Sequence, residues 1–155
     1  MLARALPAIK STPDNLDARM EGQIGMWLSI SGAATGVGVG VSHAIGHTLG
    51  GSYGIPHGIT SCLTLPSSLR WNAAANLEKQ RAVSRILGRP DRPAADLVAE
   101  LVKRLGLPGR LRDVGIRKED LPAIAEHTMH DAPVRTNPRR IERPGDIVEI
   151  LVMAW

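Results

Sequence analysis

A long uncharged stretch is the feature that most limits how this chain can fold. From Gly22 to Leu69 the sequence contains no Asp, Glu, Lys or Arg. Aromatic residues make up only 3% of the chain and Phe is absent, so a core must be built from Leu, Ile, Val, Ala and Met. Closely packed helices with small residues satisfy this composition better than an aromatic-rich β-sandwich does. With 155 residues, the chain has the size of one ordinary domain.

Helical periodicity recurs along the chain, and no segment alternates apolar and polar residues convincingly with period two. We therefore predict an all-α fold, a helical bundle with short connections. Capping residues and glycines set the expected ends, for example Thr12 as an N-cap and Gly50-Gly51 as a stop. The predicted helices cover about residues 12–34, 42–49, 59 or 66 to 76, 77–87, 91–105, 118–129 and 146–155.

The window from Ile24 to Val41 has about the length of a membrane-spanning helix. Three glycines in it, Gly32, Gly36 and Gly40, repeat at the GxxxG interval of membrane helix pairs. Its hydroxyl residues and many glycines make it only weakly hydrophobic. We predict a helix buried inside a protein and no membrane partner.

The net charge of +4 and the isoelectric point of about 9.8 raise the possibility of nucleic-acid binding. However, no run of like charges reaches five residues, and aromatic side chains for base stacking are almost absent. The sequence therefore predicts a mixed, solvated surface and no nucleic-acid partner. Cys62 is the only cysteine, which rules out an intrachain disulfide and favours a cytoplasmic location.

Three of the five histidines lie in one short uncharged segment, HAIGHTLGGSYGIPHG. His43 and His47 are four residues apart, which places both on one face of a helix. His57 follows a glycine-rich turn and Pro56, so it can fold back toward that face. Converging neutral imidazoles suit zinc, iron or nickel. The spacing alone fits either a metal site or hydrogen-bonded core histidines, and no acid lies nearby to complete a ligand set.

Other candidate sites are weaker. Gly36-x-Gly38-x-Gly40 departs from the dinucleotide-binding pattern G-x-G-x-x-G and follows no predicted strand, so we interpret it as a helix-packing and hinge segment. Cys62 and His57 are close enough in sequence for a nucleophile pair, but a small buried thiol is the favoured interpretation. His127 and His130 are expected to be surface residues near the end of a helix.

The histidine segment, followed by LPSSLRWN (residues 65–72), resembles the signature of iron-containing, group III alcohol dehydrogenases, especially the maleylacetate reductases. EDLPAIAEHTMHD (residues 119–131), TNPRR (residues 136–140) and the closing DIVEIL extend the resemblance over essentially the whole chain. It implies a family fold similar to dehydroquinate synthase, with an N-terminal NAD(P)-binding domain and a C-terminal all-helical, metal-binding domain. Residues 1–155 resemble only the C-terminal domain.

The resemblance also implies site roles and cofactors. His43 and His57 match two metal ligands for Fe²⁺ or Zn²⁺, whereas His47 matches a catalytic residue beside the nicotinamide of NAD(P). The family's other two ligands form an Asp-x-x-x-His pattern on an earlier helix, and residues 1–42 contain no His. The metal site in this chain is therefore expected to be incomplete, and the NAD(P)-binding domain is expected to be missing.

Two functional hypotheses follow. In the first, the chain is the C-terminal portion of a metal-dependent, NAD(P)-linked oxidoreductase acting on a small alcohol, aldehyde or oxo-acid, and it is inactive alone. Its partner is then a separate N-terminal half or a second copy in a homodimer. In the second, it is a non-catalytic helical oligomerisation module with a vestigial metal site. The sequence leaves the substrate, the choice between NAD and NADP, and the metal open.

Overall fold

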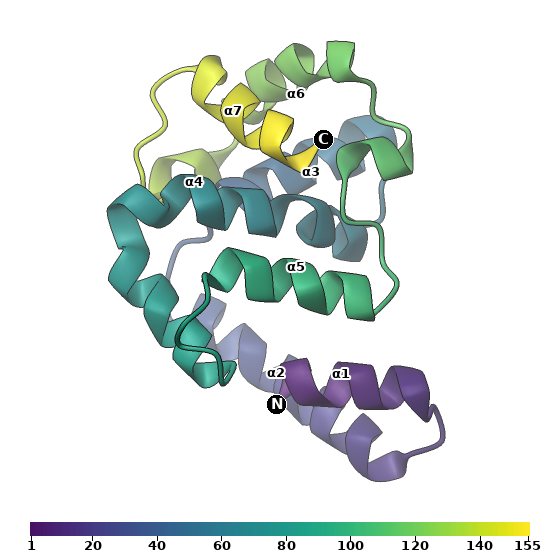
Figure 1. Cartoon of the computed structure of the whole chain (residues 1–155). Coiled ribbons are helices and arrows are strands. Elements are labelled where there is room, and N and C mark those ends of the chain that lie inside the picture. Colours follow the sequence, from purple (N-terminus) through teal and green to yellow (C-terminus); the bar gives the residue numbers. More distant parts are fainter.

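The structure is a computed structural model that describes residues 1–155, apart from the side chain of residue 33. The described residues form helices and no strands, as predicted. Figure 1 shows α1 and α2 as a hairpin at the end of the molecule far from α6 and α7, with α4 and α5 between them. The α-helices are α1 (Leu2–Ser11), α2 (Leu16–Ala34), α3 (Val41–Tyr53), α4 (His57–Ile86), α5 (Ala94–Arg104), α6 (Leu121–Thr128) and α7 (Pro144–Ala154).

The N-terminal region differs from the prediction. Helix α1 was not expected, and Thr12 lies at its C-terminal end instead of starting the next helix. Helix α2 begins at Leu16, where the Ala18 amide donates to the Asn15 side-chain oxygen at 3.0 Å. Asn15 is therefore the cap, and the Thr-Pro pair belongs to the turn between two helices.

Helix α3 is longer than predicted, because it continues through Gly50 and Gly51 to Tyr53. It ends at Gly54, whose φ of 66° is the left-handed conformation that glycine adopts easily. Glycine lowers helix stability by about 1 kcal/mol relative to alanine. Here the completely buried Leu49 holds the last turns against the core, so packing overrides local propensity.

Helix α4 starts at His57, earlier than predicted, and has a kink at Asn76 with φ −140° and ψ 27°. The break between the two predicted helices at residues 76 and 77 is thus confirmed. The predictions of α5, α6 and α7 are also confirmed. The core is formed by α3, α4, α6 and α7 together with residues 111–116, and its largest completely buried side chains include Ile45, Leu49, Leu63, Leu111, Ile124, Ile147, Ile150 and Leu151.

Candidate functional site

The structure brings the three histidines of the uncharged stretch together. His43 and His47 lie on the same face of α3, with ring centres 4.5 Å apart. His57 is the first residue of α4, and its ring centre lies 5.1 Å from that of His43 and 6.0 Å from that of His47. The turn between α3 and α4 therefore folds back as the glycine and proline spacing predicts.

Close contact between α3 and α4 positions these rings. At Gly46 a Cβ atom would lie 2.8 Å from the Thr60 hydroxyl, so only glycine fits without displacement. That hydroxyl donates to the His57 carbonyl at 2.8 Å. A second link joins the Ser42 and Thr64 hydroxyls at 2.9 Å. The helix pair thus fixes where His57 sits relative to His43.

The glycines before α3 serve a similar packing purpose. A Cβ atom on Gly38 would lie 2.7 Å from Thr136, and one on Gly40 would lie 2.9 Å from the Asn137 side chain. Asn137 also accepts a hydrogen bond from the Val41 amide at 3.1 Å, at the first turn of α3. The glycine-rich segment therefore allows residues 136–137 to approach closely, which agrees with the packing interpretation.

Asp131 joins the site from the far end of the sequence. It follows α6, and its carboxylate lies 2.6 Å from His47 Nδ1. A carboxylate in this position favours the tautomer with hydrogen on Nδ1 and leaves Nε2 free to accept a proton. Two hydroxyls hold α6 against α3, because Thr48 and Thr128 are hydrogen-bonded at 3.0 Å. Asp131 was not singled out in the sequence analysis, although it belongs to the family-like segment 119–131.

His127 and His130 are exposed, as predicted, but they also line a cavity beside His47. The cavity has a volume of about 470 Å³. Its wall comes from α3 and from the end of α6, and the Ser52 hydroxyl lies 3.3 Å from His127 Nδ1. The sequence signal for this arrangement is the pattern His-x-x-His-Asp at residues 127–131. The lining residues are His47, Thr48, Gly51, Ser52, His127, His130 and Asp131.

Electrostatics favour a neutral His43. Its partial burial, together with the neighbouring rings of His47 and His57, lowers the pKa of its imidazole. A neutral imidazole has a lone pair available for a metal ion. The side chain of His47 is 47% exposed, and His57 is also exposed. Two of the three histidines are therefore accessible to solvent.

The separation of the His43 and His57 rings can be compared with that of two imidazoles bound to one metal ion. Two imidazoles that share a zinc ion at Zn–N distances of about 2.1 Å have ring centres about 5 Å apart in a near-tetrahedral arrangement. The observed separation is 5.1 Å. Among the described residues, however, no group of three or more His, Cys, Asp or Glu side chains is arranged to hold a metal ion. Further ligands would have to come from outside these residues.

Cys62 lies apart from this group. Its thiol donates to the Gly58 carbonyl at 3.3 Å and lines a different cavity. Burial raises the pKa of the thiol, which disfavours the reactive thiolate. These observations favour the interpretation of Cys62 as a small, partly buried thiol over a Cys–His nucleophile.

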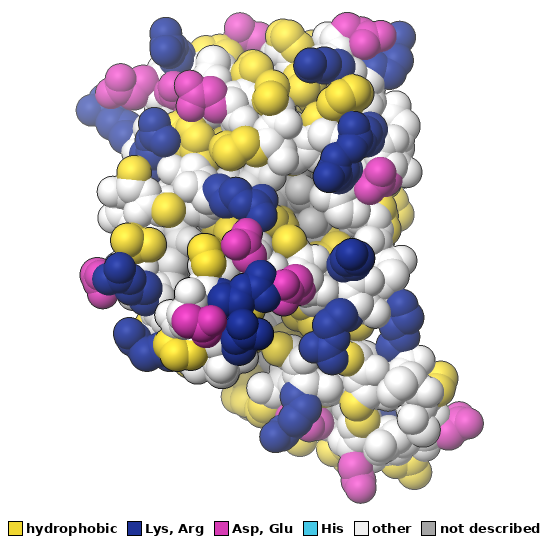
Figure 2. Space-filling model, viewed as in Figure 1, with side chains coloured by type: hydrophobic (Ala, Val, Ile, Leu, Met, Phe, Trp, Pro, Cys, Tyr) yellow, Lys and Arg dark blue, Asp and Glu magenta, His cyan; other side chains and the backbone are white. Residues whose placement is uncertain are grey.

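The surface charges are mixed, as predicted. On the face shown in Figure 2, Lys and Arg side chains are spread among Asp and Glu and do not form a continuous basic patch. No described helix has both the length and the apolar character needed to span a bilayer.

Comparisons with known proteins place the chain in a family. All residues from 1 to 155 match the model of the Fe-containing alcohol dehydrogenase family, C-terminal. The chain therefore belongs to this family. The expected resemblance and the all-helical fold are both confirmed.

Curated relatives share about a third of their residues with the chain. Lactaldehyde reductase of Escherichia coli K12 is 36% identical over 104 residues, which is 61% of this chain and 27% of that protein. Maleylacetate reductase of Pseudomonas aeruginosa is 34% identical over 140 residues, which is 90% of this chain and 38% of that protein. The chain thus spans well under half the length of these relatives.

Solved structures also match nearly the whole chain, and the match again covers less than half of each longer protein. A putative alcohol dehydrogenase from Ralstonia eutropha JMP134 is 38% identical and superposes with a TM-score of 0.87, covering 99% of this chain and 42% of that one. Maleylacetate reductase from Agrobacterium tumefaciens is 29% identical with a TM-score of 0.84, again covering 99% of this chain and 42% of that one. In both, more than half of the longer chain lies outside the matched region.

Proposed function

We propose that this chain contributes part of the active site of an NAD(P)-linked, metal-dependent oxidoreductase, and that it is inactive alone. The observation that carries the proposal is the convergence of His43, His47 and His57, with the first and last of these 5.1 Å apart. The family supports the reaction class, since relatives named for lactaldehyde and maleylacetate are reductases. The substrate class is accordingly a small alcohol, aldehyde or oxo-acid.

In this proposal His43 and His57 are two of the ligands of an Fe²⁺ or Zn²⁺ ion. When bound, the ion acts as a Lewis acid on a substrate oxygen, and NAD(P)H supplies the hydride. The lowered pKa of His43 keeps its imidazole neutral and able to bind. The remaining ligands and the NAD(P) site belong to polypeptide outside residues 1–155.

His47 is the proposed catalytic residue, and Asp131 is its positioning residue. The 2.6 Å contact at Nδ1 directs Nε2 away from Asp131, where it can give or take a proton at the substrate oxygen. The open position of His47, with 47% of its side chain exposed, leaves room for a nicotinamide ring to lie against it. Its role therefore combines proton transfer with orientation of the cofactor.

The exposed apolar surface of α2, most of which lies in the uncharged stretch, supports the presence of a larger assembly. The prediction that the window from Ile24 to Val41 is a buried helix is wrong for this chain, because apolar side chains of α2 are strongly exposed, with Trp27 at 73% and Ile30 at 64% of their full surface. Large apolar patches on soluble proteins are usually covered by a partner. The proposed cover is the polypeptide that precedes this region in the longer relatives, or a second copy of the chain.

Hydride transfer can be tested in two steps. The purified chain, supplied with Fe²⁺ or Zn²⁺ and with lactaldehyde or maleylacetate, should oxidise no NADH. Addition of the N-terminal three fifths of the Pseudomonas aeruginosa maleylacetate reductase should restore turnover, and His47→Ala should abolish it. Persistent inactivity of every combination, together with stable self-association of the chain, would instead support the non-catalytic oligomerisation module. Turnover by the chain alone would contradict the proposed dependence on a second segment.

A further inference from the structure

A second cavity is lined by residues of α4, and it shares no lining residue with the histidine cavity. Its volume is about 770 Å³, within the usual range for small-molecule sites. Helices α4, α5 and α7 form its walls together with the turn at residues 106–113. We propose that this cavity binds a small organic carboxylate with an apolar body, at a site separate from the proposed hydride-transfer chemistry.

Positive charge dominates the polar part of the lining. Arg70, Lys103 and Arg110 line the cavity, whereas Asp113 is the only acid that does so. Arg70 is paired with Asp96 at 2.8 Å. In the part of the chain that the structure describes, neither Lys103 nor Arg110 has a carboxylate within 4.0 Å. Two cations therefore remain without an ionic partner.

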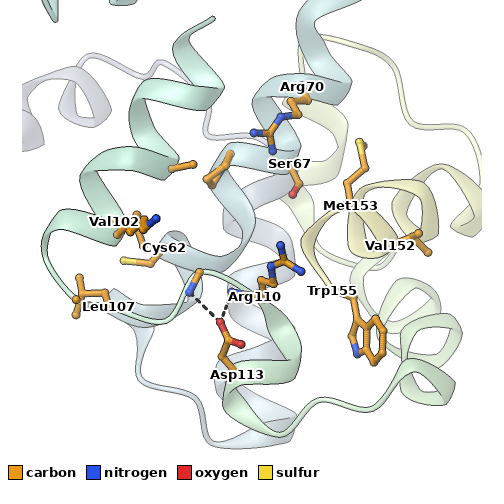
Figure 3. A pocket seen from close by; sticks show the side chains of 15 residues that line it. Cys62, Ser67, Arg70, Val102, Leu107, Arg110, Asp113, Val152, Met153 and Trp155 are labelled. Atoms are coloured by element: carbon orange, nitrogen blue, oxygen red, sulfur yellow. Dashed lines mark hydrogen bonds between the residues drawn. The ribbon is translucent and has the colours of Figure 1, made fainter.

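The Asp113 carboxylate does not pair with Lys103 or Arg110, because it accepts hydrogen bonds from backbone amides. One of its oxygens accepts hydrogen bonds from the amides of Gly109 and Arg110 at 3.3 and 3.0 Å. Figure 3 shows these two bonds, with the Arg110 side chain extending away from Asp113 into the cavity. An incoming carboxylate can therefore meet the Arg110 guanidinium without displacing an existing ion pair.

Ser67 adds a hydroxyl group to the wall of the cavity. The residue is only 2% exposed. In Figure 3 the Ser67 oxygen lies between Arg70 and Arg110. A carboxylate oxygen placed here would accept charge-assisted hydrogen bonds from the Arg110 guanidinium and a hydrogen bond from the Ser67 hydroxyl.

The remainder of the lining is apolar, which decides between an inorganic and an organic anion. Val102 and Leu107 stand on the α5 side, and Met153 and Trp155 stand on the α7 side (Figure 3). A bare phosphate ion would leave these surfaces in contact with water. A carboxylate attached to an aryl or alkyl body would cover them and keep its charge near Arg110.

Cys62 provides a site-specific test because it lines the cavity and is the only cysteine in the chain. The measurement is the rate of Cys62 alkylation by uncharged iodoacetamide at pH 8.5, with 4-phenylbutyrate as the probe. Saturating 4-phenylbutyrate should slow alkylation at least about fivefold by covering the thiol. The uncharged analogue 4-phenylbutanol should protect at least about tenfold more weakly, since it lacks the charge.

Substitutions of the cationic residues show whether the probe protects Cys62 by binding in this cavity. Arg110→Gln should weaken protection by 4-phenylbutyrate about fivefold or more, and Lys103→Gln should weaken it by a smaller factor. Arg85→Gln, which changes an exposed arginine elsewhere on α4, should leave protection unchanged. Circular dichroism and thermal unfolding establish that each variant is folded.

Three results would overturn the proposal. Equal protection by 4-phenylbutanol would show an apolar groove without anion selectivity. Equal protection by inorganic phosphate would show a general anion site. Unchanged protection in both Arg110→Gln and Lys103→Gln, with folding intact, would place the probe elsewhere.

Discussion

The His47 imidazole and the Asp131 carboxylate are 84 positions apart in the sequence, yet their nitrogen and oxygen atoms lie 2.6 Å apart. The contact joins α3 to the end of α6, which are also held by the Thr48–Thr128 hydroxyl pair. A charged acceptor at Nδ1 determines which imidazole nitrogen carries hydrogen. The fold therefore sets the tautomer of His47 before any substrate arrives.

Asp131→Asn should change that tautomer. The amide can donate to Nδ1, which moves the imidazole hydrogen to Nε2 and removes the free acceptor. Nitrogen-15 NMR of the histidine side chains should show His47 with hydrogen on Nδ1 in the original chain and on Nε2 in the variant. In an active assembly the same change should lower kcat about 10–100-fold. Glu126→Gln, an exposed change on α6, should alter neither quantity.

Removal of either proposed ligand should weaken metal binding. Calorimetric titration of the chain with Zn²⁺ should give weak binding, because the described residues contain no group of three or more side chains arranged to hold a metal ion. His43→Ala and His57→Ala should each lower the affinity at least about tenfold, and EDTA should reverse binding to the original chain. His127→Ala should have a much smaller effect, since its Nδ1 lies 3.3 Å from the Ser52 hydroxyl. An affinity unaffected by both His43 and His57 variants would contradict the assignment.

Several predictions that depend on local residue patterns are confirmed by the structure. The four-residue spacing of His43 and His47 and the turn before His57 correctly predicted three converging rings. Helical periodicity likewise predicted α5 and α7. These features depend on short-range geometry, which a sequence displays directly.

Features that depend on tertiary contact were missed. The local pattern His-x-x-His-Asp at residues 127–131 does not show that Asp131 reaches His47, because this contact arises from the packing of α6 on α3. The continuation of α3 through Gly50 and Gly51 also opposes local propensity and is stabilised by burial of neighbouring residues. Thr12 looked like a cap because a Thr-Pro pair fits both a helix start and an interhelical turn.

Two glycines of α3 should respond oppositely to the same substitution. Gly46→Ala should destabilise the chain by about 1–3 kcal/mol, because the new Cβ lies 2.8 Å from the Thr60 hydroxyl. Gly51→Ala, which has nothing within 4 Å, should stabilise it by about 0.5–1 kcal/mol. Urea unfolding of both variants measures the free energy change. Equal effects of the two substitutions would mean that α3 and α4 do not approach closely at Gly46.

The Asp146 carboxylate, in the first turn of α7, predicts a pH-dependent contribution to folding stability. Hydrogen bonds from the Glu142 and Arg143 amides to Asp146 lower the pKa of its carboxyl, with the Arg143 guanidinium nearby. A lowered folded-state pKa means that the stabilisation is present above the unfolded pKa of about 4 and disappears as pH falls through the folded value. Asp146→Ala should therefore cost about 1 kcal/mol of unfolding free energy at pH 7.

The same substitution should cost progressively less as pH falls below about 5, because the Asp146 carboxyl takes up its proton in the unfolded chain at a higher pH than in the folded chain. Urea unfolding at pH 7, 5, 4 and 3 gives the difference between the two proteins at each pH. Asp14→Ala, which removes an exposed carboxylate in the turn between α1 and α2, provides the matched control and should change stability by less than about 0.5 kcal/mol at pH 7. A constant difference for Asp146→Ala across this range would mean that its contribution comes from packing and is independent of its charge.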